Sequence, residues 1–532
     1  MREEIKKTVE NSIKALQKER KLSDFEIPEV LIESPKESAH GDYSCNIALV
    51  LSKIIKKNPK ETADLLISTI KSQESRLLER VEPAGPGFIN FFVSKECLQK
   101  QIGAVVKQKN KFGDLKIGNK RKVNIEFISA NPTGPLTLGN GRGGFCGDVL
   151  ANVMEKAGYG VKREYYLNDI GAQIKKLGHS VLGDAEAVYK GKYIDELRKK
   201  IKGQDPEKVG KKSAQIILKQ MIKPSVKKMG IKFDVWFSEE SLYKKNEVDK
   251  IIGELSKKGF TYESEKAIWF KSKGIGDDKD RVLVRADGIK TYFASDIAYL
   301  KNKFNRGFGQ LVFFLGADHY GYVARLEAAA IALGYSRKQI KPIVMQLVRL
   351  FEKGKEVRMS KRTGIYITID ELINEVGLDV ARFFFLTRSP NTHLNFNMDL
   401  AKKQSKENPV YYVQYAYARI CSILKKAPSH NAQHSTKSQA LNLLKEPEEL
   451  ELIKRVIKFP EVIEDTAKDY QVQRLPQYAV DLADSFHKFY EKCQVITDNK
   501  ELTLARLSLV LGVKIVLKNT FDLMGVSAPE KM

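Results

Sequence analysis

The sequence predicts an α/β fold, in which a doubly wound, Rossmann-like domain lies between an N-terminal α+β domain and an all-α C-terminal domain. An apolar run at residues 123–128 is followed by a glycine-rich loop and by an apolar-periodic helix at 145–157. Strand, glycine-rich turn and helix form the opening unit of a doubly wound nucleotide-binding sheet. Further strand patterns occur at 281–285 and 310–315, and helical periodicity replaces them after residue 408.

The N-terminal region begins with a polar helix and contains an apolar helical pattern at 46–55. A Gly-Pro-Gly segment at 85–87 leads into a β-rich run at 88–93, which predicts a turn followed by a strand. A stretch rich in Lys, Gly and Asn at 107–122 is predicted to be a linker. The domains that we expect are an N-terminal domain over residues 1–110, the doubly wound domain over 118–400 with a basic helical insertion at about 180–280, and a helical domain over 405–532.

The composition indicates a protein that meets a polyanion. The 532 residues carry 91 Lys and Arg against 66 Asp and Glu, a formal net charge of +25. Such a surplus suits a nucleic acid or a membrane surface, or is balanced only by solvent counterions. Residues 189–230 alone hold 13 Lys and Arg against four Asp and Glu, which is why the insertion is predicted to be basic.

The cysteines and the apolar runs limit where the protein works. The five cysteines are far apart and have no C-x-x-C spacing, so neither a disulfide framework nor a zinc ribbon is expected. No segment has the pattern of a signal peptide or the length of a membrane span. We therefore expect a cytoplasmic protein with no membrane partner and no protein-bound structural metal.

The loop at residues 131–144 places five glycines within eleven positions, between the strand and the helix. Glycine lets a backbone approach a nucleotide closely, and the helix N-terminus offers free N–H groups and a positive dipole end to phosphate. The alternative is a tight strand-to-helix turn that binds no ligand.

A second glycine-bounded loop at residues 354–364 carries three cations within five residues, at 358–362. Lysines on loops suit a triphosphate or pyrophosphate, although a run of charge alone is usually a solvated face. The two loops, in this order and at this separation, are stronger evidence for nucleotide binding than either loop alone.

With both loops, the sequence resembles the class I aminoacyl-tRNA synthetases, and specifically the arginyl-tRNA synthetases, over nearly the whole chain. Met359-Ser360-Lys361 matches the second signature of the class, K-M-S-K, with Arg358 in place of the first lysine. The other matching segments are His40-Gly41-Asp42-Tyr43, Asn168-Asp169 with Gly171 and Gln173, residues 233–239, Gly316-Ala317-Asp318-His319, and residues 346–350, 389–393, 407–420 and 525–532. The resemblance implies an N-terminal appended tRNA-binding domain, a class I catalytic domain and a helical anticodon-binding domain.

One departure concerns the first class signature, H-x-G-H, which is replaced by Thr137-Leu138-Gly139-Asn140. In the family the two histidines bond the ATP phosphates as charge develops. Asn140 can donate through its amide and Thr137 through its hydroxyl, but neither carries a positive charge. We expect Arg142, Arg358, Lys361 and Mg²⁺ to compensate.

The resemblance also implies which residues meet ATP. The residues expected there are Gly139, Asn140, Arg142, His319, Gln346, Val348, Met359, Ser360 and Lys361, with catalytic roles for Asn140, Lys361, Arg358 and Thr137. His319 follows a predicted strand end, where ribose or base contacts are expected. A structural role for this histidine is an equal alternative.

Recognition of free arginine requires a carboxylate that faces the guanidinium, because a planar acceptor pair matches its fork of N–H groups. The resemblance assigns this role to Asp296, with Tyr292 one helical turn earlier on the same face. Glu126 and Asn131 match positions that hold the amino, carboxylate or guanidinium group of the substrate. Without the resemblance, Asp296 would be interpreted as an exposed helix acid.

Three regions are candidates for tRNA contacts. Tyr411 and Tyr415 share a helix face, near Arg419; such rings can stack on bases, although rings at helical spacing usually pack in a core. Arg506 lies in a segment similar to the anticodon-binding domain of the family. Phe88, Asn90 and Phe92 alternate along one strand face, where the appended domain is expected to meet the tRNA elbow.

The resemblance implies ATP-dependent attachment of L-arginine to tRNA(Arg) through arginyl-adenylate, with ATP and Mg²⁺ as cofactors. It also implies activation that depends on bound tRNA, and we expect a monomer. One alternative is a tRNA-binding paralogue with an inactive amino-acid activation site. Another is a different nucleotidyltransferase on the same fold.

Overall fold

The computed structural model describes residues 1–532 except 36, 74–75, 318–320, 358–366 and 428–437. The described chain divides into two compact units. One comprises Met1–Phe112, Arg419–Glu461 and Leu482–Val516, and the other comprises Gly113–Ala418, Val462–Asp481 and Leu517–Met532. The helices that contribute residues to both units are α17 (Pro409–Lys426), α20 (Phe459–Asp469), α21 (Arg474–Lys492) and α22 (Lys500–Met524).

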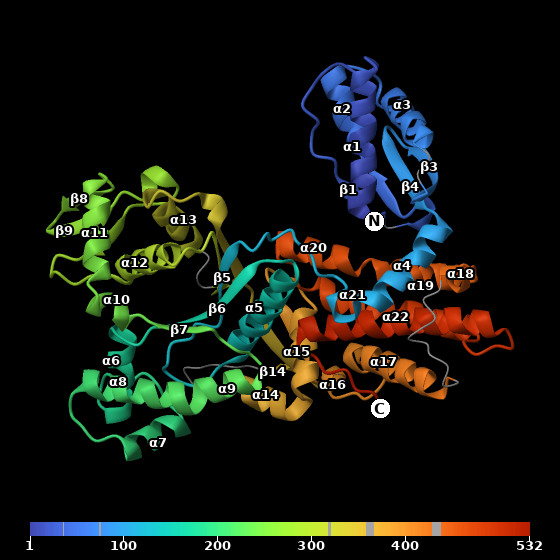
Figure 1. Ribbon diagram of the computed structural model, residues 1–532. Helices are drawn as coiled ribbons and strands as arrows, with labels where there is room; N and C mark the ends of the chain where they lie inside the picture. The colour runs from blue at the N-terminus through green and yellow to red at the C-terminus, as the bar shows by residue number, and fades with distance from the viewer. Residues whose placement is uncertain (36, 74–75, 318–320, 358–366, 428–437) are drawn as a thin grey trace. The chain divides into compact units, whose positions relative to one another are not determined.

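The first unit contains a four-stranded antiparallel sheet in the order β1-β2-β4-β3, with helices packed on it. Its N-terminal elements are α1 (Arg2–Lys18), β1 (Ile32–Glu33), β2 (Tyr43–Cys45), α2 (Ile47–Ile55), α3 (Pro59–Ser72), β3 (Leu78–Ala84), β4 (Phe88–Val93) and α4 (Lys95–Gln108) (Figure 1). The predicted strand at 88–93 is confirmed as β4, and the apolar helical pattern at 46–55 as α2.

C-terminal helices complete the same unit. They include α18 (Ser438–Leu441) and α19 (Pro447–Ile457). The amide of Gln99 on α4 donates to the carbonyl of Leu444 at 2.8 Å, and Tyr43 on β2 donates to Glu461 on α20 at 2.7 Å. An ion pair joins Lys454 Nζ to Asp42 Oδ1 at 2.5 Å. Residues from both ends of the chain thus form one core.

The second unit is built on a five-stranded parallel sheet in the order β12-β11-β5-β6-β7. Its strands are β5 (Lys122–Glu126), β6 (Gly160–Leu167), β7 (Val235–Ser238), β11 (Gln310–Gly316) and β12 (Ile340–Met345). Because β5 comes first in the chain and lies in the middle, successive connections run outward from it in opposite directions. In such a sheet ligands bind at the carboxyl ends of the strands beside this switch point.

Helices and two small sheets surround the parallel sheet. Apart from the helices between β6 and β7, these are α5 (Leu138–Lys156), α10 (Glu240–Lys244), α11 (Glu247–Lys257), α12 (Tyr292–Asn305), α13 (Tyr322–Ala332), α14 (Ile369–Val376), α15 (Leu378–Leu386) and α16 (Met398–Ala401). One small sheet joins β8 (Thr261–Ser264), β9 (Ala267–Phe270) and β10 (Arg281–Val284), and the other joins β13 (Val348–Glu352), β14 (Lys355–Val357) and β15 (Leu394–Asn397). The strand predicted at 281–285 therefore exists, as β10, in a separate antiparallel sheet.

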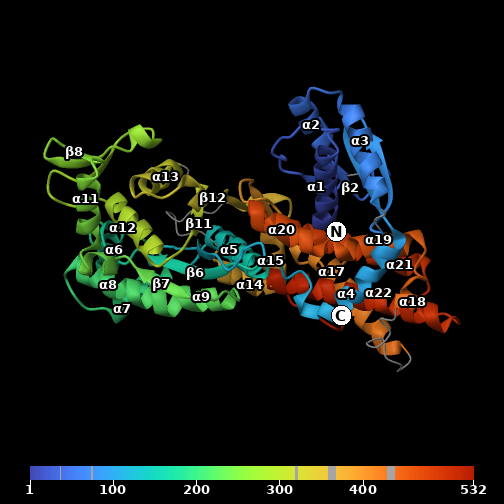
Figure 2. The same ribbon diagram turned by 45° about the horizontal axis from the view of Figure 1, so that its top comes forward.

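The basic segment between β6 and β7 is helical, whereas the rest of the predicted insertion at about 180–280 also contains the strands β7, β8 and β9. It consists of α6 (Ala172–Leu182), α7 (Lys192–Lys200), α8 (Pro206–Ile217) and α9 (Lys223–Lys228), and Figure 2 shows α8 and α9 in line with one another. A five-residue π-helical turn, Leu218–Ile222, connects these two helices. In the described part of the chain after residue 408 all regular elements are helices, and no described helix has the length and hydropathy of a membrane span.

Candidate active site

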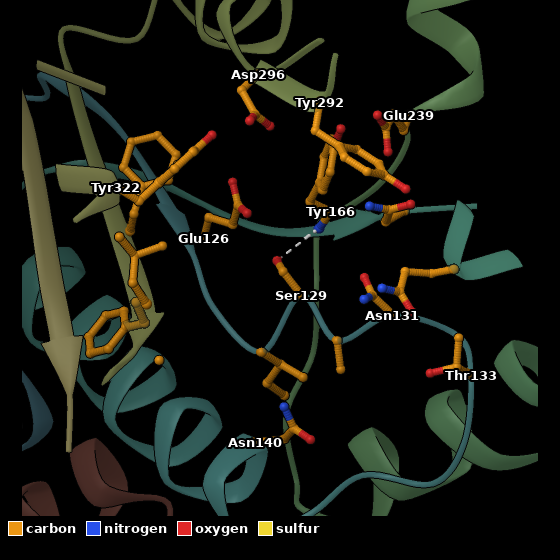
Figure 3. Close-up of a pocket in the computed structure, with 18 of the residues that line it drawn as sticks. Glu126, Ser129, Asn131, Thr133, Asn140, Tyr166, Glu239, Tyr292, Asp296 and Tyr322 are labelled. Atoms are coloured by element: carbon orange, nitrogen blue, oxygen red, sulfur yellow. Dashed lines mark hydrogen bonds between the residues drawn. The ribbon is translucent and has the colours of Figure 1, made fainter. Parts of the chain in front are cut away.

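A cavity of about 770 Å³ opens at the carboxyl ends of the parallel strands, beside the switch point of the sheet (Figure 3). Four lining residues lie at or just beyond strand ends: Glu126 on β5, Asn168 after β6, Glu239 after β7 and Gly316 on β11. The remaining lining residues come mainly from the loop after β5 and from α12 and α13. Since parallel strands all end at one edge, side chains that are far apart in the sequence converge here.

The loop after β5 begins with a sharp turn. Ile128 and Ser129 have φ angles of +66° and +38°, a region that costs a residue with a side chain about 1–3 kcal/mol. Two hydrogen bonds from β6 hold this turn: Tyr166 N donates to Ser129 Oγ at 3.0 Å, as drawn in Figure 3, and the Tyr165 hydroxyl donates to Ala130 O at 2.9 Å. The chain then places Asn131 in the wall of the cavity.

The first turns of α12 carry Tyr292 and Asp296, and both line the cavity. Ala172 N donates to the Tyr292 hydroxyl oxygen at 3.0 Å. Gly171, at φ +83°, passes so close that a Cβ atom there would lie 2.9 Å from the same oxygen. Glycine satisfies both the φ angle and the close approach, so the start of α6 fixes the ring of Tyr292. The structure thus brings all four predicted arginine-site residues, Glu126 and Asn131 included, to one cavity.

Three carboxyl groups, those of Glu126, Glu239 and Asp296, face the cavity (Figure 3). Burial raises the pKa of Asp296 to about 7, and the charges of the other two carboxylates add to this rise against a hydrogen bond from Tyr322. Burial also raises the pKa of Glu239 to about 7, against a hydrogen bond from Ser295. Low dielectric and like charge both disfavour the ionised form. A cationic ligand would relieve this cost.

Glu239, Tyr322 and Arg325 have no role predicted from the sequence, yet all three line the cavity. Glu239 belongs to a segment that carries the family resemblance. Its place directly after a strand is the signal that could have identified it, because Glu126, the last residue of its own strand, lies at the same edge of the sheet. Tyr322 and Arg325 are three residues apart and therefore share a face of α13. That helix follows the strand at 310–316, so its first turn is expected near the carboxyl end of the strand, which is the signal in the sequence for these two residues.

A second cavity of about 420 Å³ shares Asn140 and Gly316 with the first. Four predicted ATP residues line it, namely Gly139, Asn140, Gln346 and Val348. Leu347, which is 61% exposed, adds an apolar surface to its wall. Asn140 therefore lies where the two cavities meet.

Thr137 and Asn140 bond to each other at the start of α5. Thr137 is the N-cap, and Asn140 Oδ1 accepts from Thr137 N at 3.0 Å and from the Thr137 hydroxyl at 2.9 Å, a reciprocal capping box. Thr137 also lines the second cavity, and in this arrangement its hydroxyl donates to Asn140; its catalytic role stays a prediction. The same bonds occupy the oxygen of Asn140 and leave its NH₂ group as the donor that a ligand can use.

The segment after the second signature is joined to the first signature. Ile369 N donates to Leu136 O at 3.1 Å, and Thr137 and Thr368 form an isolated antiparallel bridge. The predicted ATP residues Arg358, Met359, Ser360 and Lys361 lie outside the described residues, and so does His319.

Arg142 has a different place from the predicted one. Its side chain is fully buried, and it donates to Gln346 O at 2.7 Å and to Ser389 O at 2.9 Å. Burial lowers the pKa of this guanidinium. The prediction that Arg142 faces ATP is therefore wrong: the residue ties α5 to the connection between β12 and β13.

The predicted tRNA face of the N-terminal domain is only partly at the surface. Phe88 is 37% exposed, and Phe92 is partly covered by the guanidinium of Arg80, whose Cζ lies 3.8 Å from the ring centroid. Asn90 is 6% exposed, so its side chain is not available to a macromolecule, which corrects that assignment.

The aromatic rings of α17 divide between surface and core. Tyr411 and Tyr415 stack with ring centroids 6.5 Å apart, and Tyr415 is 37% exposed. Tyr417 is buried. Farther along the helix, the Arg419 guanidinium lies over the ring of Tyr490 at 4.9 Å.

Arg506 is a buried structural residue. It is 8% exposed, and it donates to Glu449 Oε1 and to Gln494 O, both at 2.7 Å. The prediction that Arg506 contacts tRNA is therefore corrected.

Comparison with known proteins agrees with this architecture. Family models match in three consecutive regions: the arginyl tRNA synthetase N terminal domain over residues 3–93, the catalytic domain of class I (R) tRNA synthetases over 101–182 and 184–384, and the DALR anticodon binding domain over 413–532.

Curated relatives and solved structures match over the whole chain. Proteins named arginine–tRNA ligase from Acetivibrio thermocellus and Caldanaerobacter subterraneus subsp. tengcongensis are 43% and 44% identical, each match covering 100% of this chain and 99% of the relative. The arginyl-tRNA synthetase structure from Thermus thermophilus shares the fold with a TM-score of 0.78 at 19% identity, and the match covers 100% of both chains. The structure from Plasmodium falciparum has a TM-score of 0.80 at 18% identity, and the match covers 100% of this chain and 99% of the other. On the matched domains and the identity of these relatives, the chain belongs to the arginyl-tRNA synthetase family.

Proposed function

We propose that the chain attaches L-arginine to tRNA(Arg) in two steps, through an arginyl-adenylate. The observation that carries this proposal is the pair of adjoining cavities, one lined by three carboxyl groups and the other by four of the predicted ATP residues, with Asn140 at their boundary. In the first step an oxygen of the arginine carboxylate forms a bond to the α-phosphorus of ATP, and the bond from that phosphorus to the β-phosphate oxygen breaks. Pyrophosphate leaves. In the second step a hydroxyl of the terminal tRNA ribose attacks the arginyl carbonyl, and AMP leaves.

The larger cavity would hold the arginine. Glu239 is buried and Asp296 is part-buried against the cavity, and the free protein ionises both carboxyls at a cost. The planar guanidinium has N–H groups in a fork that matches carboxylate oxygens, so its arrival would restore their charge. Tyr292, whose oxygen already accepts from Ala172 N, keeps its own proton to donate. Lysine lacks the planar fork, and citrulline lacks the charge.

The smaller cavity would hold the adenosine of ATP, with Gln346 and Val348 beside the base and Gly139 close to the phosphates. The N-terminus of α5 would meet the phosphates, since free N–H groups and the helix dipole favour an anion there. The NH₂ group of Asn140 would bond the α-phosphate where the two substrates meet. From the sequence, Arg358, Met359, Ser360 and Lys361 are expected to cover the departing pyrophosphate.

Mg²⁺ would arrive with the ATP. Among the described residues no group of three or more His, Cys, Asp and Glu side chains is placed to hold a metal ion. Mg²⁺ usually keeps several waters and binds through one or two carboxylates together with substrate phosphates. When bound, it would neutralise charge on the pyrophosphate.

For tRNA, the accessible residues are the better candidates. Phe88 and Phe92 on β4 and the stacked pair Tyr411 and Tyr415 on α17 would offer rings to bases. Arg419 and the basic insertion would contact phosphates, a contribution that weakens with salt. We further propose that the protein acts as a monomer in the cytoplasm.

The other candidate is a tRNA-binding paralogue whose activation site is dead. The absence of both signature histidines favours it, whereas the three converging carboxyls and the capped Asn140 favour an active site. Charging of tRNA(Arg) with a panel of single amino acids separates the two. The proposal predicts charging with arginine alone. Binding of tRNA without charging by any amino acid would support the paralogue.

A further inference from the structure

One face of α12 connects the larger cavity to the protein interior. Tyr292, Asp296, Tyr299 and Lys303 recur at intervals of four, three and four residues, so they lie along one side of the helix. The first three line the cavity, whereas the side chain of Lys303 is fully buried. A lysine in that position needs partners, because an uncompensated buried charge is costly.

Lys303 has its partners at the floor of the cavity. Its Nζ donates to Glu126 Oε2 at 2.6 Å and to Asn124 Oδ1 at 2.7 Å. The ammonium also lies 4.5 Å and 4.4 Å from the ring centroids of Tyr299 and Phe313, a favourable setting for a cation. Because Lys303 is enclosed on these sides, it has one position, and the short bond transmits that position to Glu126.

Glu164, the other buried carboxylate nearby, has partners of its own. Arg306 donates to it twice, at 2.6 and 2.8 Å, and Tyr299 and Asn124 donate at 2.5 and 2.9 Å. Lys303 Nζ is farther away, at 3.9 Å. Since the NH₂ group of Asn124 is directed to Glu164, its oxygen is directed to Lys303. The interior network thus turns Lys303 toward Glu126.

We infer that Lys303 is a positioning residue for arginine recognition. It holds one oxygen of Glu126, so that the other oxygen faces the substrate. The inference rests on the proposed function. Glu126 lines the cavity, and Lys303 bonds its Oε2 alone, which leaves Oε1 for an N–H of arginine.

The three carboxyls of the cavity then have different roles. Glu126 is paired with the ammonium of Lys303. Burial raises the pKa values of Asp296 and Glu239 to about 7, and the cationic substrate would stabilise their ionised forms. Without Lys303, Glu126 would lose the ammonium that bonds its Oε2, and its carboxylate would be free to rotate. A rotated carboxylate no longer directs Oε1 toward a cationic N–H of the substrate.

A purely structural ion pair makes a different prediction. Buried pairs often add little net stability, and removing one partner destabilises the fold because a charge is left unpaired. In that case Lys303→Met would lower the melting temperature without changing the affinity of the folded protein for arginine. Affinity, and not stability, therefore decides the question.

The experiment measures the Kd of arginine by calorimetry, and kcat and KM by tRNA charging, on the full chain. The variants are Lys303→Met, Glu126→Gln and the double variant. Lys301→Met is the matched control, because Lys301 is on the same helix but pairs with Glu254 at 3.2 Å and lines neither cavity. We expect Lys303→Met to weaken arginine binding at least tenfold, with kcat and the KM for ATP within threefold of wild type and the control unchanged.

The double variant shows whether Lys303 acts through Glu126. We expect it to bind arginine as Glu126→Gln does, within twofold, since the carboxylate that Lys303 holds is already absent. A folded Lys303→Met protein with unchanged affinity would overturn the inference. A tenfold difference in the Kd of arginine between Glu126→Gln and the double variant would also overturn it. This comparison tests the inference even if Lys303→Met alone does not fold. Wild-type protein that binds no arginine would contradict the proposed function itself.

Discussion

Gly141 of the signature helix and Ile369 at the start of α14 approach so closely that a Cβ atom on Gly141 would lie 2.5 Å from Ile369 Cδ1. Ile369 is fully buried, and its N–H bonds the carbonyl of Leu136. Through this contact the helix after the second signature is seated on the helix of the first. The two signature segments are thus placed together by packing.

Gly141→Ala should therefore destabilise the protein, although alanine is the better helix former. The added methyl group has to displace a buried side chain, and overpacking of this kind costs about 1–3 kcal/mol. Gly143 provides the control, because it lies on the same helix and a Cβ atom there would have no heavy atom within 4 Å, so Gly143→Ala should be neutral or stabilise by up to about 1 kcal/mol. Urea unfolding of the ligand-free proteins measures both. Equal unfolding free energies would contradict the contact.

Arginine should bind more tightly as the pH rises from 6 to 8. In the free protein the pKa values of Asp296 and Glu239 are about 7, so both are partly protonated at pH 6. A bound guanidinium favours the ionised forms and lowers these pKa values, so binding releases protons. Calorimetry in buffers of different ionisation enthalpy measures the release. Affinity that is the same at pH 6 and pH 8, with no proton release, would contradict this account.

Asp296→Asn should stabilise the ligand-free protein at pH 8 while it abolishes arginine binding. The folded-state pKa of Asp296, about 7, is above the value of about 3.9 in an unfolded chain. The folded state therefore holds more protons between these values, and this contribution to stability is lost as the pH rises from about 4 to 7. Asparagine loses nothing over that range. We expect a gain of about 1–2 kcal/mol at pH 8 that shrinks at pH 5, measured by urea unfolding. A variant less stable than wild type at pH 8 would show that the carboxylate is not strained.

Asn140→His should lower activity, although it restores a histidine of the class signature. Asn140 Oδ1 accepts from Thr137 N and from its hydroxyl, and imidazole cannot reproduce both bonds while it also bonds phosphate. We expect the helix cap to lose about 1 kcal/mol and pyrophosphate exchange to fall roughly ten- to a hundredfold. Steady-state exchange kinetics check this. Activity equal to or above that of wild type would mean that the position serves phosphate regardless of the cap.

The sequence predicts local structure and the substrate pocket well where the signal lies in a short segment. The strand at 88–93 and the strand, loop and helix after residue 122 follow from patterns of neighbouring residues. The four residues assigned to arginine by resemblance meet in one cavity, because parallel strands and one helix face bring them to the same edge.

The sequence does not predict which cationic side chains are buried. The sequence favours contacts with polyanions for Arg142 and Arg506, since an Arg is rarely fully buried, but their partners are carbonyls and a carboxylate. The partners of Arg142 are about 200 or more positions away in the chain, so no local pattern indicates them. Lys303 escapes prediction for the same reason, because its partners Asn124 and Glu126 are more than 170 positions away in the chain.

The protein should activate arginine although both signature histidines are absent. We would measure arginine-dependent exchange of pyrophosphate into ATP with tRNA(Arg) present. We expect exchange with arginine in the wild-type protein, none with lysine or citrulline, and none with arginine in Asp296→Asn. Absence of exchange in wild-type protein that still binds tRNA(Arg), or exchange that survives in Asp296→Asn, would contradict this expectation.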